Sequence, residues 1–106
     1  MATGEEYIKY VCERTDRFGL VRYRKMFGEY MLYIDNKPVF TVCDNTVFVK
    51  ELKDIESIMS ASGRGFPYDG AKEAYIVDIE NDVLLDKLIP VLLDVVPVSK
   101  PKKSNH

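Results

Sequence analysis

The spacing of apolar residues changes from a helical to a strand period early in the chain. At the start, apolar and small residues recur every three or four positions, which predicts an amphipathic helix ending near residues 16–19 (Ile8, Val11, Cys12 and Thr15). From residue 21, Val21 and Tyr23 alternate with Arg22 and Arg24. A period of two indicates a strand with one exposed face.

A run of apolar and aromatic residues from position 25 to 34 dominates the chain and is broken by one glycine and one acid. Such a continuous run, rich in aromatic and branched residues, indicates a strand buried on both faces. We therefore expect residues 30–34 to form the centre of the sheet. Gly28 permits a bend or bulge just before them.

Two Asp-Asn pairs, at 35–36 and 44–45, predict tight turns, since both residue types tolerate the left-handed backbone conformation. The first pair precedes an apolar segment at 39–43, and the second separates it from another at 46–50. We interpret both segments as further strands. The first half of the chain is thus predicted to be a helix followed by an antiparallel meander of four strands.

The second half returns to a helical period. Its spacing predicts a short helix that stops at residues 62–63 (Leu52, Ile55, Ile58 and Met59). Residues 63–70 read as a loop, which we expect Phe66 and Tyr68 to anchor over the sheet. Branched residues at 74–79 predict a last strand.

A C-terminal helix follows, with leucines and isoleucine at helical spacing (Leu85, Leu88, Ile89 and Leu92). Pro90 lacks a backbone donor, so it either lies in the first turn of a helix starting near Asp86 or kinks a longer helix. The first arrangement is favoured. Residues 1–96 then form a single α+β domain, and the basic segment 97–106 is predicted to be a disordered tail.

Composition and charge narrow the classes of function. A chain of 106 residues is long enough for one core without metal or disulfide support. Basic and acidic residues number 8 and 7 in the first 50 positions but 4 and 10 from 51 to 96, so a polyanion meets no overall attractive field.

No apolar stretch has signal-peptide or membrane-spanning character, which predicts a cytoplasmic protein without membrane contact. The cysteines, Cys12 and Cys43, are expected to be reduced.

Several segments together resemble the N-terminal domain of TfoX/Sxy-type competence regulators. The resemblance rests on an Arg-x-Met-Phe-Gly entry, a Leu-Tyr hairpin, a strand ending in lysine and a Phe-Pro-Tyr segment, and it covers residues 5–96 (Met26, Phe27, Gly28, Leu32 and Tyr33 carry its signature). It implies a secretion-chaperone-like α+β fold and a regulatory role without catalytic residues. The resemblance implies neither metal nor cofactor.

Candidate chemistry is sparse. The one histidine, His106, is the last residue, so a histidine-assisted nucleophile or histidine metal site is not expected. The glycines between 63 and 70 match neither the P-loop nor the dinucleotide spacing and favour turn chemistry. We therefore predict no enzymatic activity and no cofactor.

Two features point to binding instead. Arg22, Arg24 and Lys25 with the interleaved Tyr23 have the composition of a phosphate-binding face, which makes nucleic-acid binding one alternative. A small anionic ligand, or an enzyme, using the loop at Arg64 is another. The leading prediction is a regulatory protein-interaction domain that forms a homodimer, because the apolar strands exceed what three short helices can cover. A monomer covered by its own last helix and loop remains the alternative.

Overall fold

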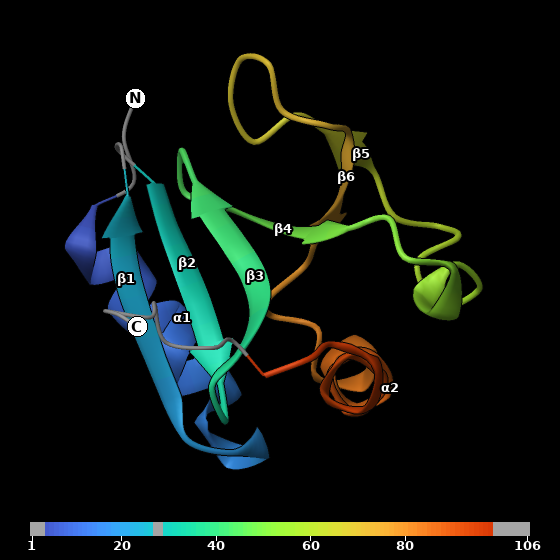
Figure 1. Ribbon diagram of the computed structural model, residues 1–106, viewed down its shortest axis with the longest axis horizontal. Helices are drawn as coiled ribbons and strands as arrows, with labels where there is room; N and C mark the ends of the chain where they lie inside the picture. Colours follow the sequence, from blue (N-terminus) through green and yellow to red (C-terminus); the bar gives the residue numbers. More distant parts are fainter. Residues whose placement is uncertain (1–3, 27–28, 99–106) are drawn as a thin grey trace, which may run out of the picture.

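The computed structural model describes residues 4–26 and 29–98, which form a mixed α+β fold. Six antiparallel strands make one sheet in the order β1-β2-β3-β4-β6-β5, with a helix near each end of the chain (Figure 1). The elements are α1 Glu5–Thr15, the 3₁₀ helix η1 Asp16–Phe18, β1 Val21–Met26, β2 Glu29–Ile34, β3 Lys37–Cys43, β4 Thr46–Lys50, the 3₁₀ helix η2 Lys53–Ile55, β5 Arg64–Gly65, β6 Ala74–Val77 and α2 Asp82–Val95. The α+β prediction is confirmed.

The meander of four strands is confirmed, together with its two tight turns. All four turn residues have positive φ, as left-handed two-residue turns require (Asp35 52°, Asn36 66°, Asp44 56° and Asn45 56°). β2 is buried on both faces, with Leu32 on one and Tyr33 on the other. It is nevertheless the second strand from an edge, since β6 and β5 extend the sheet beyond β4; β3 and β4 form the centre.

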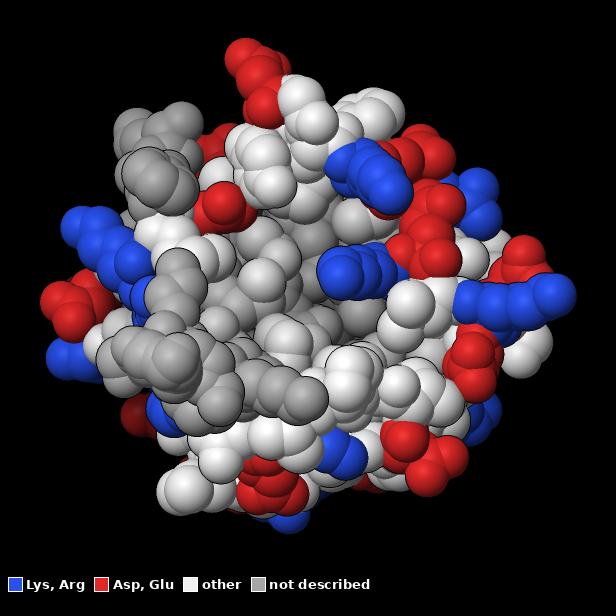
Figure 2. Space-filling model, in the orientation of Figure 1, with Lys and Arg blue, Asp and Glu red and all other residues white. Residues whose placement is uncertain are grey.

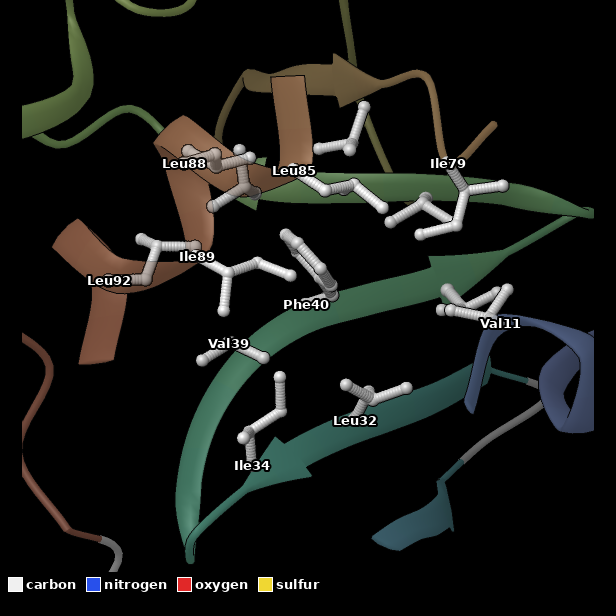
Figure 3. Close-up of a cluster of buried hydrophobic side chains, with 14 of the residues drawn as sticks. Val11, Leu32, Ile34, Val39, Phe40, Ile79, Leu85, Leu88, Ile89 and Leu92 are labelled. Atoms are coloured by element: carbon white, nitrogen blue, oxygen red, sulfur yellow. The ribbon is translucent and has the colours of Figure 1, made fainter. Parts of the chain in front are cut away.

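Both helices pack against one face of the sheet and enclose the core. Figure 3 shows Leu85, Ile89 and Leu92 of α2 converging on Phe40 of β3, with Val11 of α1 near the same cluster. All five side chains are essentially inaccessible to solvent. Each such aliphatic or aromatic side chain contributes roughly 1.5–3 kcal/mol by leaving water, so this layer is the main source of stability.

The predicted second helix is wrong. Only three residues, Lys53–Ile55, form a 3₁₀ helix, and turns continue to residue 61. The apolar spacing arises because Ile55 and Met59 are both fully buried. The Met59 amide donates a hydrogen bond to the Ile55 carbonyl, four residues earlier as in an α-helix, but this bond does not continue into a helix. The loop prediction for 63–70 also changes, since β5 pairs there with β6, Arg64 lying opposite Tyr75.

The preferred position of Pro90 is wrong as well. α2 begins at Asp82, where the Asn81 side chain accepts a hydrogen bond from the Leu84 amide at 3.1 Å, so Pro90 lies in the helix interior. The cap and the buried Leu85 fix the helix well before the proline is reached. Pro90 itself is exposed, on the side where a missing hydrogen bond is most easily tolerated.

Some predictions fall on residues outside those described. These are the bend at Gly28, the signature residue Phe27 and the tail from residue 99 onward. Within the described ranges, neither helix has the length and apolar content needed to cross a membrane.

Candidate interaction surface

The face of the sheet turned away from the core carries an apolar hollow over β3 and β4. In Figure 1, α1 lies behind β1–β3, and in the same orientation Figure 2 shows a white, hollowed centre with charged side chains mainly around it. Two adjoining chambers of about 330 and 720 Å³ form this hollow. They share a floor from β4 and its neighbours (Thr41, Phe48, Val49, Lys50 and Leu52).

The smaller chamber is bounded by the C-terminal end of α2 on one side and by β2 and β3 on the other. Its walls are apolar apart from Thr41, Lys50 and Asp54 (Met31, Pro38, Val39, Phe40, Leu92, Val95, Val96 and Pro97). Lys37 ties β3 to this end of α2 by donating from Nζ to the Leu93 carbonyl. The larger chamber lies between β4 and the segment 67–74.

Exposed apolar side chains gather at the rim of the hollow. Phe66 is 64% exposed, Tyr68 52%, Val95 36% and Val98 54%, four of the six large apolar side chains exposed in the described ranges. Tyr68 and Val95 line the chambers, whereas Phe66 and Val98 are sequence neighbours of the lining residues Pro67 and Pro97. The prediction that Phe66 and Tyr68 anchor the loop over the sheet is wrong, since both face solvent. Contiguous exposed apolar surface of this kind marks interaction sites.

The predicted basic residues of β1 lie on both faces of the sheet. Arg22 is opposite Tyr33 and Arg24 is opposite Met31, a residue of the hollow, so both arginines share the face of the hollow. Lys25 points to the other face, as Tyr23 does. The predicted strand is confirmed, and Arg22 and Arg24 share one of its faces as its two-residue period predicts, whereas Lys25 lies on the other.

Contacts hold the side chain of Arg22 in place, unlike those of Arg24 and Lys25. Its guanidinium lies 4.3 Å from the centroid of the Tyr33 ring, and its Nε donates to the Asn36 Oδ1 at 3.2 Å. The side chains of Arg24 and Lys25 are exposed and make neither ion pairs nor hydrogen bonds with the described residues.

Arg64 does not join this group. It lies on β5, at the opposite edge of the sheet from β1, where its Nε is 3.4 Å from the Glu51 Oε2 and its guanidinium is 5.0 Å from the Tyr75 ring. The hydrogen bond to Tyr75, and the charge of Glu51, raise the pKa of Arg64 above its usual value. Because Glu51 already neutralises it, Arg64 offers little to a small anion.

The signature residues have structural positions where they are described. Leu32 is fully buried in the core, Tyr33 lies beneath Arg22, and Met26 is half-buried at the end of β1. These positions explain the residue types by packing, so they assign no chemistry.

Glu29, the first residue of β2, is the acid that breaks the apolar run at 25–34. Its Oε1 is enclosed and has no hydrogen-bond partner among the described residues, and burial raises the pKa of its carboxyl group. Burial, followed by the charge of Glu29, raises the pKa of the Cys43 thiol, and burial also raises that of Cys12. Both thiols are free and remain protonated at neutral pH, a poor state for a nucleophile.

Across the described residues, no three His, Cys, Asp or Glu side chains are arranged to hold a metal ion. The surface that the geometry singles out is thus the hollow, with the basic edge strand β1 as a second feature.

Comparison with known proteins gives one clear relationship. The chain is 33% identical over 106 residues to the "uncharacterized 12.7 kDa protein in trpE 5′ region" of Spirochaeta aurantia, an alignment covering 98% of this chain and 92% of that protein. No family model matches the chain, and no solved structure matches it. The chain therefore belongs to the same family as this spirochaete 12.7 kDa protein.

Proposed function

We propose that this protein is a non-enzymatic, regulatory protein-interaction domain that pairs with a second copy of itself through the hollow. The supporting observation is the ring of exposed apolar side chains around an apolar depression on one face. Removing such surface from water favours association in proportion to the area buried. The resemblance to TfoX-type N-terminal domains supports regulation rather than catalysis, and the two free thiols suit a cytoplasmic location.

A second copy suits this surface because the projecting aromatic side chains and the smaller chamber lie on the same face of the molecule. Phe66 and Tyr68 project at one rim, and the smaller chamber opens beside α2 at the other. A two-fold axis between them lets each copy place its aromatic side chains against the chamber of the other, which is the self-complementary arrangement of symmetric dimers.

The available area is of the right size for a dimer. One aromatic side chain buries about 150–250 Å² in all. Because Phe66 is 64% exposed and Tyr68 52%, the four projecting aromatics of a dimer can bury roughly 350–600 Å² more. The chamber walls that they contact add a similar contribution, which brings the interface to the ~1,000 Å² expected of specific association.

Light scattering after size-exclusion chromatography tests the proposal. The protein is expected to elute with the mass of a dimer at micromolar concentration. The double variant Phe66→Ser/Tyr68→Ser should weaken dimerisation by roughly 100-fold, because aromatic anchors dominate interface energies, while its circular dichroism stays unchanged. Leu20→Ser is the matched control, since Leu20 is 71% exposed but lines neither chamber. A wild-type monomer throughout the concentration series, or a variant that dimerises as well as the wild type, contradicts the proposal.

A further inference from the structure

β1 is an open edge of the sheet. It has six residues, Val21–Met26, stands first in the strand order and pairs only with β2 among the described strands. The backbone groups on its outer side therefore pair with none of the strands that the structure describes, and they can receive another extended chain. Exposed edges are where proteins add a strand from a partner.

The positive charges on β1 have no carboxylate partners in the described chain, whereas the arginines elsewhere in the fold do. Arg14 pairs with Asp82 at 2.7 Å, Arg17 pairs with Asp86 at 2.7 Å, and Arg64 pairs with Glu51. The basic residues of β1 have no such carboxylate partner within the described chain (Arg22, Arg24 and Lys25). The stacking of Arg22 on Tyr33 fixes one of them in advance, which lowers the entropy cost of binding an anion there.

A second copy of the chain does not suit this edge. Antiparallel pairing of β1 with itself brings basic residues opposite basic residues, and like charges on facing strands are destabilising. The occupant of β1 therefore differs from the occupant of the hollow.

We propose that β1 binds an extended acidic segment of another protein, which adds to the sheet as a seventh strand. Carboxylates at alternate positions of that segment face Arg22 and Arg24 on one side, and an acid at an intervening position faces Lys25 on the other, as the two-residue period of a strand requires. Backbone hydrogen bonds supply affinity, and the charges select an acidic sequence. This inference goes beyond the proposed dimer and does not depend on it.

A protein strand fits the edge better than a nucleic acid does. Its three cations are divided between two faces, whereas phosphate-binding surfaces gather many on one. The formal net charge of the chain is −2, which gives no long-range attraction for a polyanion.

Peptide binding to the full chain tests the inference, with fluorescence anisotropy as the measurement. The probe is a labelled peptide of about eight residues, within the usual range of strand lengths. Glutamates alternate with valines along it, and one further glutamate replaces a valine near the middle so that an acid can face Lys25. It is expected to bind, whereas the same peptide with lysine in place of glutamate is not. Arg24→Glu should weaken binding at least about tenfold, since a repulsion replaces an attraction. Lys87→Glu is the control, because it makes the same change of charge at an exposed position of α2.

Further arms separate the alternatives. N-methylation of alternate peptide amides on one edge must abolish binding if the peptide adds as a strand; unchanged binding overturns strand addition. Duplex and single-stranded DNA are titrated in parallel, and DNA that binds more tightly through Arg24 overturns the choice of an acidic protein segment. Absence of peptide binding at low salt overturns the inference outright. The double variant Phe66→Ser/Tyr68→Ser should bind the peptide as the wild type does, so failure of the dimer and failure of this site are distinguishable.

Discussion

The guanidinium of Arg22 stacks on the ring of Tyr33, 4.3 Å from its centroid, across the first two strands of the sheet. This contact covers an aromatic side chain on the face of β2 turned away from Leu32 and the core, where Tyr33 is only 6% exposed.

Arg22→Ala should lower the free energy of unfolding by about 0.5–1 kcal/mol, the usual contribution of an exposed cation–π contact. Urea denaturation followed by circular dichroism measures it. Arg24→Ala removes the same charge from the same strand but breaks no ion pair, hydrogen bond or ring contact with the described residues, so its effect should stay within about 0.5 kcal/mol. Equal losses for the two variants would show that charge, rather than stacking, is responsible.

Gly19, just before β1, packs directly against Asp35, which lies in the turn between β2 and β3. A Cβ at position 19 would lie 2.7 Å from the Asp35 Oδ2, and the Asp35 Oδ1 accepts a hydrogen bond from the Leu20 amide at 2.9 Å. Gly19→Ala should therefore destabilise the protein by about 1–3 kcal/mol, since either the backbone or this carboxylate must move. At Gly63 a Cβ meets only the Ile76 Cδ1 at 3.8 Å, so thermal denaturation of Gly63→Ala should give a nearly unchanged melting temperature.

Glu29 makes stability depend on pH in a defined direction. Burial raises its pKa above the value of 4.5 for a free side chain, so the folded state holds the proton more tightly than the unfolded state. Stability from this group is therefore present at low pH and is lost as pH rises through the unfolded and then the folded pKa. Glu29→Gln should stabilise the protein by about 1 kcal/mol at pH 7, because the enclosed Oε1 has no hydrogen-bond partner among the described residues.

The gain from Glu29→Gln should vanish below about pH 4, where the wild-type carboxyl is protonated in both states. Denaturation at pH 7 and at low pH measures the difference. Glu56→Gln, a substitution at an exposed position, should change stability little at either pH. A gain that is constant with pH would assign the effect to packing.

Pro90 interrupts an otherwise regular helix at an exposed position. Pro90→Ala should restore the hydrogen bond to the carbonyl of Asp86 and raise the free energy of unfolding by about 1–3 kcal/mol. Denaturant unfolding is again the measurement. A loss of stability would mean that Pro90 is needed for the packing of Leu92, which is fully buried.

Local chemistry determined much of the fold from the sequence alone. The Asp-Asn pairs set both hairpin turns because few other residues accept positive φ, and the alternation from Val21 to Arg24 located a strand with one exposed face. The apolar repeat of Leu85 to Leu92 located the buried side of α2. These features depend on neighbours in the chain, so a sequence pattern is sufficient to find them.

The tertiary structure decided the rest. The spacing of Ile55 and Met59 fits a helix and a set of turns equally, and only packing against the core selected the turns. Arg22, Arg24 and Arg64 were all candidate binding residues, and only the strand order shows that Arg64 lies at the opposite edge of the sheet from the other two. The hollow likewise arises where β4, the end of α2 and the segment 67–74 meet, parts of the chain that are distant in sequence. A sequence determines what each residue can do, whereas only the fold determines which residues do it together.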